Sequence, residues 1–385
     1  MPSTSRLSRC RDMCRPPRKP PPRRCGRTVW EYKHMTPLQT IVKLSHEFGS
    51  LDYVKGGGGN TSVKDAGTLW VKPSGTTLGG LTEATFVAMN RAKINALYAV
   101  KTPPVAAARE ELVKNMMAAA VENDAGRPSV EAPLHNVFDA TYVVHTHPCA
   151  VNGLTCAKDG ESACKRLFPD ALWVDYIDPG YTLCMEVRKR IDAYRTAHGH
   201  QPALLVLKNH GIFIAADTAD EIRALYGRVM DTLRMVYKSA GISQALEIDN
   251  APANPAIESQ ITALFGVDAA FTASCGLFAD APGPLTPDHL VYAKAFPFTG
   301  PLTAAAVSQY KAERGYAPKV VVAGGRVYGI GTSQKNADLA LDLAQDGALV
   351  LKLTAAFGGV EYMTDAAREF IENWEVESYR QRQAG

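Results

Sequence analysis

Two histidines two positions apart follow a run of apolar, strand-forming residues. The segment Val143-Val144-His145-Thr146-His147-Pro148 predicts a buried strand that the proline ends. In a strand, side chains at positions i and i+2 point to the same face, so His145 and His147 can both reach one ion. The alternative is an incidental His-x-His pair, because short motifs often arise by chance.

A third histidine occupies a comparable position later in the chain. Residues 204–214 indicate two apolar strands joined at Asn209-His210-Gly211, a tight turn that can present His210 at the end of a sheet. Two histidines from one strand and one from another turn give a three-nitrogen metal site with an open coordination position. Such a site is more typical of a catalytic ion than of a structural one.

A run of four glycines and two further small polar turns can bind an anion. Residues 56–62 (GGGGNTS) indicate a loop of exposed backbone N–H groups, which suits a phosphate. The turns at 73–76 (PSGT) and 128–131 (PSVE) can donate further N–H groups. The Walker spacing is missing, as is a GxGxxG after a strand, so nucleotide binding is not indicated. The alternative for the glycine run is a flexible turn.

One carboxylate lies close in sequence to the histidine strand. Glu131 precedes His145 by 14 residues and can act beside the metal as a general base. Alternatively, it is a first-turn glutamate that the helix dipole favours. His135, one helical turn further on, competes as a ligand, although a helix histidine more commonly serves packing or lies at the surface.

Composition limits the class of protein. The chain has 385 residues, of which 46% are hydrophobic and 21% charged, which is typical of a soluble protein long enough for two domains. No run of about 18 apolar residues occurs, so no membrane span is predicted. Eight cysteines in a chain of this length form no disulfide framework, and a cytoplasmic location is expected.

Residues 1–34 differ from the rest of the chain. They carry ten Lys and Arg, two acidic residues and six prolines, so the remainder has a net charge of about −5, which argues against a nucleic-acid partner. We expect this basic leader to be disordered. It lacks the apolar core of a secretion signal, and Met35 directly precedes a helix start. An over-extended start site is therefore the favoured explanation, and a basic targeting arm is the alternative.

The remaining pattern predicts a mixed α and β chain. We expect a catalytic domain over residues 35–248 and a C-terminal α/β extension over 258–385, joined by a proline-containing linker at 249–257. The segments 206–218 and 321–332 share a strand-turn-strand plan, which is either a weak internal repeat or a chance similarity between two hairpins. Helices are expected near 37–48, 107–122, 219–240 and 335–345, and strands near 68–71, 173–176, 204–214 and 319–331.

Five of these motifs stand in the order of a known family. The segments GGNTS, KPSG, PSVE, HTHP and KNHG resemble the class II aldolase/adducin superfamily. Residues 283–289, the hairpin at 320–331 and residues 373–377 resemble the aldolase portion of bacterial bifunctional rhamnulose-1-phosphate aldolase/alcohol dehydrogenases. The likeness covers nearly everything after Met35.

The resemblance implies a three-layer αβα fold with a central, mainly antiparallel sheet, and a homotetramer with sites near subunit boundaries. The family's divalent, zinc-type ion would be held by His145, His147 and His210, and Glu131 matches its acid/base glutamate. Tyr176 matches the tyrosine acid that a neighbouring subunit supplies, by its place before a Pro-Gly turn. Val130 departs from a second serine in the phosphate site. The positions that match the family's phosphate site are Gly59, Asn60, Thr61, Ser74, Gly75 and Ser129.

The activity that the resemblance implies is reversible cleavage of a ketose 1-phosphate to dihydroxyacetone phosphate and an aldehyde. Glu131 would move the proton at carbon, and Tyr176 the proton at the aldehyde oxygen. A sugar-phosphate 4-epimerase of the same superfamily is the alternative enzyme. An adducin-like interaction module without chemistry is the alternative of another class, but three converging histidines and a glutamate argue against it.

Overall fold

A central sheet of seven strands organises the first two thirds of the chain in the computed structural model, which describes residues 35–374. All neighbouring strands pair antiparallel except the last, which runs parallel to its neighbour. The predicted leader at 1–34 and the end of the resemblance at 375–377 lie outside these residues. In spatial order the strands are β3 (Val87–Asn90), β2 (Thr68–Val71), β1 (Asn60–Lys64), β4 (Tyr142–Thr146), β7 (Gly211–Ala216), β6 (Leu204–Leu207) and β5 (Leu172–Val174).

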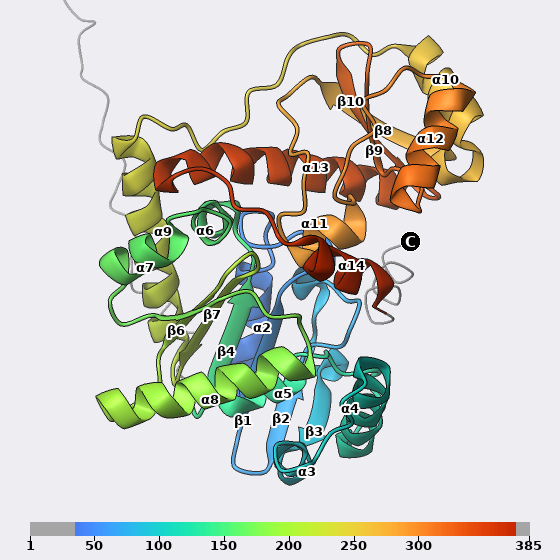
Figure 1. Cartoon of the computed structure of the whole chain (residues 1–385). Helices are drawn as coiled ribbons and strands as arrows, with labels where there is room; N and C mark the ends of the chain where they lie inside the picture. The colour runs from blue at the N-terminus through green and yellow to red at the C-terminus, as the bar shows by residue number, and fades with distance from the viewer. Residues whose placement is uncertain (1–34, 375–385) are drawn as a thin grey trace, which may run out of the picture. The chain divides into compact units, whose positions relative to one another are not determined.

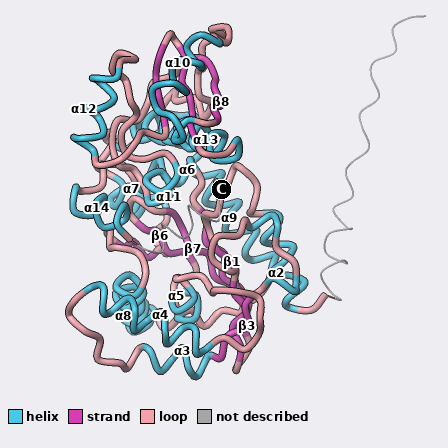
Figure 2. Tube along the Cα trace, turned by 90° about the vertical axis from the view of Figure 1, so that its right-hand side faces the viewer, coloured by secondary structure: helices cyan, strands magenta, loops and turns pink. Residues whose placement is uncertain are grey.

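Helices cover both faces of this sheet because its central strands bury side chains on both faces, as β4 and β6 show. On one face, Val143 and Phe213 pack with residues of α5 (Ala132–Val137) and α8 (Tyr181–His198). On the other face lie α2 (Pro37–Glu47) and α9 (Ala219–Ser239), which Figure 2 shows on the opposite side of the strands. The expected three-layer arrangement with a mainly antiparallel sheet is therefore confirmed. Near β3 lie α3 (Arg91–Leu97) and α4 (Ala106–Ala120), and after β4 come α6 (Cys149–Thr155) and α7 (Gly160–Leu167).

In helix α9, the sequence determines both where the helix begins and which face is buried. Thr218 is its N-cap and forms a capping box with Glu221, which satisfies two N–H groups of the first turn. The buried residues recur at helical spacing and form one apolar stripe against the sheet. They include Ile222, Tyr226, Val229, Leu233 and Tyr237.

The C-terminal extension contains a second, three-stranded antiparallel sheet in the order β8 (Phe271–Gly276), β10 (Arg326–Gly331) and β9 (Val320–Ala323). Residues of α10 (Pro255–Phe265) and α12 (Ala304–Arg314) pack on one of its faces. The long helix α13 (Gln334–Thr354) packs on the other face and continues to α6 (Figure 1). At that crossing a Cβ on Gly153 would lie 2.5 Å from the Cβ of Leu353, so the close approach requires glycine.

Two short helices lie in the same part of the chain, α11 (Pro287–Tyr292) and α14 (Asp365–Asn373), and they contact each other. Among the described residues, those from Pro37 to 374 belong to one compact unit, and the division into two domains at 249–257 stays a prediction. Short 3₁₀ turns occupy Leu78–Gly80, Glu83–Thr85, Gly266–Ala269 and Ala355–Phe357.

The structure corrects several expected boundaries. Asn60–Lys64 is strand β1, so only the glycines of the predicted loop at 56–62 remain outside regular structure. The expected linker at 249–257 gives way to α10 at Pro255, which is the first helical residue after the N-cap Asn254. Helix α13 continues to Thr354, beyond the expected end at 345.

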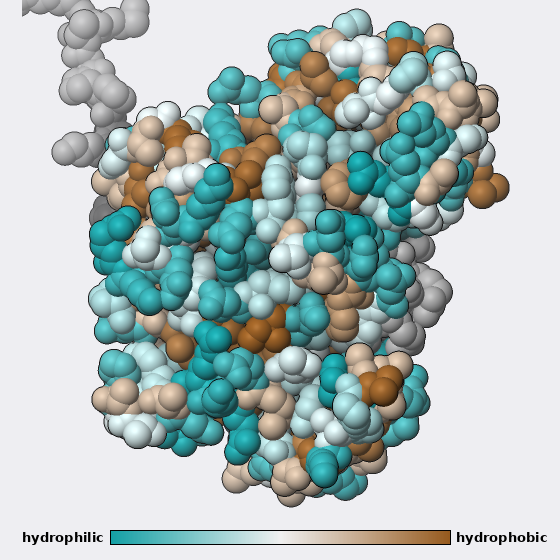
Figure 3. Space-filling model, viewed as in Figure 1, coloured by the Kyte–Doolittle hydropathy of each residue, from teal (hydrophilic) through white to brown (hydrophobic). Residues whose placement is uncertain are grey.

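Polar and apolar residues are interspersed on the face of the molecule in Figure 3. The exposed large apolar residues, such as Leu51, Val105 and Val267, belong to separate segments of the chain. Within residues 35–374, no helix combines the length and the apolar character needed to cross a lipid bilayer.

A buried lysine at the end of β1 predicts a pH-dependent stability. Burial, followed by the charge of Arg91, lowers the pKa of Lys64 to about 7, and its Nζ donates to the carbonyl oxygen of Ala140 at 2.7 Å. In the unfolded chain Lys64 keeps its proton up to about pH 10.4. Below pH 7 the folded protein also carries this buried charge, and its destabilising effect is then at its full size. Between pH 7 and 10 the folded protein loses the proton, so the destabilisation decreases as the pH rises. We expect the free energy of unfolding of the wild type, relative to Lys64→Met, to rise by about 1.4 kcal/mol per pH unit in that window. Urea unfolding at pH 6, 8 and 9.5 measures this difference, and parallel pH profiles would contradict it.

Candidate metal centre

The three histidines of the sequence analysis lie together at one end of the large sheet. Their ligand nitrogens are all within 4.8 Å of one another, and His145, His147 and His210 are buried. The strand pair β4 and β7 brings them together, since His145 pairs with Phe213 across the sheet and His210 directly precedes β7. The convergence that the spacing predicts is therefore present.

The hydrogen bonds of two rings determine which of their nitrogens can bind a cation. His145 has its Nδ1 2.8 Å from the carbonyl oxygen of Ile212, and a carbonyl oxygen only accepts, so Nδ1 carries the proton. The ring of His145 also stacks on Phe213 at 3.8 Å between centroids, which holds its plane. His147 has its Nδ1 2.5 Å from Oδ2 of Asp288, an acceptor when ionised. In the neutral rings both Nε2 atoms are therefore unprotonated.

These two Nε2 atoms face each other at 2.9 Å. Two nitrogen lone pairs at that distance repel unless a cation or a proton lies between them. An oxygen of Glu131 lies 3.3 Å from the same Nε2 of His145 and 3.8 Å from Nε2 of His210. The cluster therefore directs several electron-rich atoms at one point, which is the donor set that a divalent cation requires.

Burial favours the neutral, metal-binding form of two of the rings. Burial lowers the pKa of His147, and the nearby carboxylate of Asp288 opposes this effect without reversing it. Burial, with the neighbouring His147 and His145, holds the pKa of His210 well below its ordinary value. Neutral imidazoles are the form in which histidine binds metals, so no proton has to be displaced at neutral pH.

Glu131 reaches the histidines from the start of helix α5, where it is the N-cap residue. Its other carboxylate oxygen accepts from the Asn60 amide at 3.4 Å. Burial raises the pKa of Glu131, but its interactions with His145 and then His210 outweigh this cost, and the pKa lies well below its ordinary value. An ionised carboxylate beside an open metal position can accept a proton from a bound substrate.

A small pocket opens beside the histidines. Both predicted polar turns contribute to it, which brings the expected phosphate positions next to the metal ligands. The backbone N–H groups of Ser74 and Ser129 donate to the carbonyl oxygens of Arg127 and Lys72, so their hydroxyl groups, rather than these N–H groups, are the donors left for a ligand. The predicted residues that line the pocket are Gly59, Ser74, Gly75, Ser129, Glu131, His147 and His210.

The remaining predicted phosphate residues, Asn60 and Thr61, lie on strand β1 with their side chains on opposite faces. Side chains alternate between faces, so Asn60 and Ser62 share the histidine face, whereas Thr61 points to the opposite one. The Thr61 hydroxyl lies 2.7 Å from Ser45 of α2 and does not line the pocket. The exposed loop expected here is thus a buried strand.

Tyr176 and His135, two further residues considered for the site, both lie outside the histidine cluster and its pocket. Tyr176 is not among the residues that line this pocket, and its ring packs against the apolar cluster of the C-terminal extension. Its role as an acid supplied by a neighbouring subunit stays a prediction. His135, the competing ligand, has its Nδ1 2.8 Å from the Ser62 hydroxyl and is not part of the histidine cluster.

Lys72 is a pocket residue that the sequence analysis did not single out. It is only 3% exposed, and its Nζ donates to the carbonyl oxygens of Gly57 at 3.0 Å and Thr76 at 2.7 Å. The ammonium group therefore ties the glycine run to the turn at 73–76 and brings a positive charge to the pocket wall. The signal was its position directly after an apolar strand and directly before a Pro-Ser-Gly turn.

Asp288 is the second residue that the sequence analysis did not assign. It lies on α11 of the C-terminal extension, 141 positions from His147. Its segment, residues 283–289, matches the family resemblance, but that match gives Asp288 no role at the metal site. No spacing rule links residues so far apart, so this contact could be found only from the folded chain.

Comparison with known proteins gives a family for the same part of the chain. The family model described as "Class II Aldolase and Adducin N-terminal domain" matches residues 39–237. A Bacillus subtilis (strain 168) protein named "Uncharacterized oxidoreductase YuxG" is 27% identical over 207 residues, which cover 50% of this chain and 29% of that protein. The match thus spans less than a third of the relative's length.

Solved structures of similar proteins cover about half of the chain. The N-terminal class II aldolase domain of a conserved protein from Thermoplasma acidophilum is 24% identical, with a TM-score of 0.45, over 52% of this chain and 93% of that one. An L-fuculose-1-phosphate aldolase from Thermus thermophilus is 14% identical, with a TM-score of 0.35, over 53% of this chain and 95% of that one.

Proposed function

The chain belongs to the class II aldolase and adducin family, and we propose that it is a metal-dependent aldolase that cleaves a ketose 1-phosphate to dihydroxyacetone phosphate and an aldehyde. One observation carries the proposal. The unprotonated Nε2 atoms of His145 and His147 face each other at 2.9 Å, with the carboxylate of Glu131 beside them. A non-catalytic interaction module has no physical need for such a cluster, because electron-rich groups brought together without a cation destabilise the fold.

The histidines fit a divalent ion of the zinc type. Three neutral imidazole nitrogens from His145, His147 and His210 leave a coordination position for substrate oxygens. The bound ion supplies Lewis-acid polarisation of the ketose carbonyl, which is worth several kcal/mol. Because imidazoles add no negative charge, the positive charge at the site stays undiminished.

Glu131 is the group that we assign to proton transfer at carbon. Retro-aldol cleavage breaks the bond between C3 and C4 of the ketose, and the electron pair passes towards the C2 carbonyl. A proton must then be added to C3, and in the reverse direction it must be removed. Glu131, whose carboxylate lies 3.3 Å from the His145 nitrogen, would remove this proton in its ionised form during condensation and return it from its protonated form during cleavage.

The phosphate is assigned to the part of the same pocket that the two polar turns line. Ser74 and Ser129 offer hydroxyl groups, and Lys72 contributes a buried ammonium charge. A charged donor makes a shorter and stronger hydrogen bond to phosphate than a neutral one. Lys72 therefore compensates for Val130, which stands where the family has a second serine.

The proton at the C4 oxygen needs a different group. We keep Tyr176 as the candidate acid, supplied by a neighbouring subunit of a homotetramer, as the resemblance implies. Light scattering of the purified protein tests the oligomeric state. A monomer would remove Tyr176 from consideration, because its ring packs against the C-terminal cluster of its own chain.

The experiment that tests the reaction is a panel of ketose 1-phosphates. We expect zinc-loaded protein to release dihydroxyacetone phosphate from at least one of them, measured with a coupled reductase, and chelator-treated protein to release none. A pentulose phosphate in the panel distinguishes the related epimerase chemistry. Epimerisation of that compound without any release of dihydroxyacetone phosphate would overturn the aldolase proposal.

A further inference from the structure

The C-terminal extension contacts the metal centre directly through helix α11, which lies between α13 and the large sheet (Figure 1). Asp288 on this helix is 4% exposed, and its Oδ2 accepts from Nδ1 of His147 at 2.5 Å. The predicted catalytic domain, residues 35–248, supplies all three histidines and the glutamate but not this carboxylate. The site is thus built from both parts of the chain.

A carboxylate in this position has three effects on a metal-binding histidine. It keeps the proton on Nδ1, so that Nε2 of His147 presents its lone pair to the other histidines. It holds the ring in one orientation, and it makes the imidazole a stronger donor. Removing such an outer partner from a metal site typically lowers metal affinity about 10- to 100-fold.

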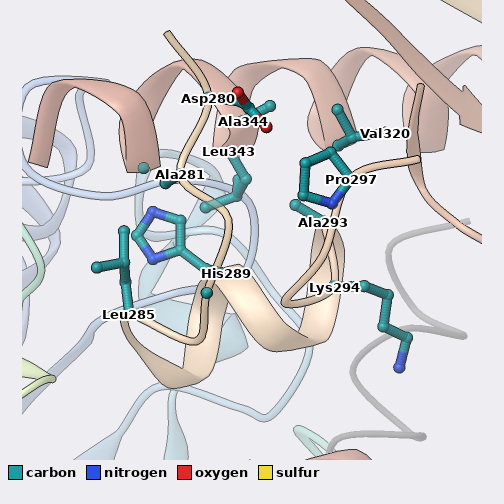
Figure 4. A pocket seen from close by; sticks show the side chains of 12 residues that line it. Asp280, Ala281, Leu285, His289, Ala293, Lys294, Pro297, Val320, Leu343 and Ala344 are labelled. Atoms are coloured by element: carbon teal, nitrogen blue, oxygen red, sulfur yellow. The ribbon is translucent and has the colours of Figure 1, made fainter. Parts of the chain in front are cut away.

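Asp288 is itself held in place by a buried network. The Thr286 hydroxyl lies 2.7 Å from Nδ1 of His289, and Nε2 of His289 lies 3.0 Å from Asp346 of α13. Figure 4 shows the His289 ring below the helix that carries Leu343 and Ala344, which is α13. These bonds fix α11 against the long helix and leave its Asp288 side directed at His147.

The glycine run packs against the same carboxylate. A Cβ added to Gly58 would lie 2.3 Å from Oδ2 of Asp288, and one added to Gly57 would lie 2.9 Å from the Tyr292 hydroxyl. At these two positions glycine is required by the close approach of α11 rather than by flexibility. The glycine run therefore packs against helix α11 of the extension and also lines the pocket.

The turn that carries the third histidine is bound to the extension as well. The Asn209 amide donates to the carbonyl oxygens of Leu285 and Glu361, both at 3.0 Å. Asn209 adopts a left-handed backbone (φ 53°), and these bonds stabilise that conformation one residue before His210. Both histidine-bearing segments are thus fixed by residues of the extension.

We propose that the C-terminal extension is a positioning element of the metal centre, with Asp288 as the outer carboxylate partner of His147. This inference rests on the proposed metal-dependent function and assigns a role to the part of the chain beyond residue 248. Asp288 is not among the residues that line the pocket, so the contribution that we assign to it is to the orientation and donor strength of His147.

The test measures metal binding in the full chain. Wild type, Asp288→Asn and the control Asp365→Asn are compared for Zn²⁺ affinity by competition with a chromogenic chelator, and for the visible spectrum of the Co²⁺-loaded protein. Asp365 is a suitable control because it is a carboxylate of the same extension whose side chain is 85% exposed. We expect Asp288→Asn to bind Zn²⁺ about 10- to 100-fold more weakly and to shift the Co²⁺ spectrum, whereas Asp365→Asn does neither.

A second variant tests the same contact from the opposite side. Gly58→Ala introduces a Cβ against Oδ2 of Asp288 and should weaken metal binding in the same direction, whereas Gly227→Ala, which meets nothing within 4 Å, should not. If Asp288→Asn fails to fold, the comparison of metal binding between Gly58→Ala and Gly227→Ala tests the inference. Wild-type affinity and an unchanged Co²⁺ spectrum in Asp288→Asn, or in Gly58→Ala where it decides, would overturn the inference. Absence of metal from the wild type would instead refute the proposed function.

Discussion

Exchange of Glu131 for glutamine is expected to lower kcat by about 10²- to 10⁴-fold while the protein keeps its metal. Glutamine has nearly the same shape and can still accept from the Asn60 amide, which lies 3.4 Å from the Glu131 carboxylate. It cannot take up a proton at neutral pH, so the chemical step loses its base. The three histidines are untouched, so metal content and the KM for a ketose 1-phosphate should change far less than kcat.

The control for this variant is Glu122→Gln, the same chemical change at an exposed glutamate that accepts from Asn90. It should turn over substrate as the wild type does. Metal content by mass spectrometry and initial rates at saturating substrate are measured on all three proteins. A Glu131→Gln protein that retains more than about a tenth of the wild-type kcat would exclude this glutamate as the base.

The metal cluster could be anticipated from sequence because its signals are local. The His-x-His spacing in a strand and the Asn-His-Gly turn between two apolar runs each define a direction for a side chain without reference to the rest of the fold. The register of β4 with β7, which places His145 beside Phe213, then brings the two signals together. The spacing of two histidines and one turn motif were therefore enough to predict which residues converge, and the sheet register explains how they do so.

Contacts that depend on tertiary packing could not be anticipated. Helix α13 was expected to end near 345, and Asp346 and Gly347 are the first residues beyond that expected end. In the folded chain Asp346 pairs with His289, and a Cβ on Gly347 would lie 3.2 Å from the His289 ring. The helix continues because these two residues meet α11, a partner that no local pattern reveals.

The phosphate site was predicted in part for a similar reason. The residues around Ser74 and Ser129 were found through turn signals, and both line the pocket. Thr61 was grouped with them because it follows the glycines, but strand β1 begins at Asn60, and alternation turns Thr61 towards α2. A loop was expected over residues 56–62, and a loop prediction does not specify which side chains share a face, whereas a strand does.

Replacing His210 with alanine is expected to remove the metal almost completely at micromolar concentrations. This change deletes one of three protein ligands, so the loss should exceed the roughly 100-fold that follows removal of an outer partner. His210 suits the test because it lies in a turn rather than in the sheet, and the turn's backbone bond from its N–H to Leu207 is retained in alanine. By contrast, His145 is fully buried and stacked on Phe213, and its loss would also disturb the core.

Metal content after dialysis against micromolar Zn²⁺ measures this effect, with His200→Ala as the control because His200 is an exposed histidine outside the cluster. The wild type and the control should each hold about one ion per chain, and His210→Ala should hold almost none. Addition of imidazole to His210→Ala should restore part of the binding, because the free base can occupy the vacated position of the ligand. Equal metal content in all three proteins would place the ion elsewhere and leave the facing nitrogens of His145 and His147 to share a proton instead.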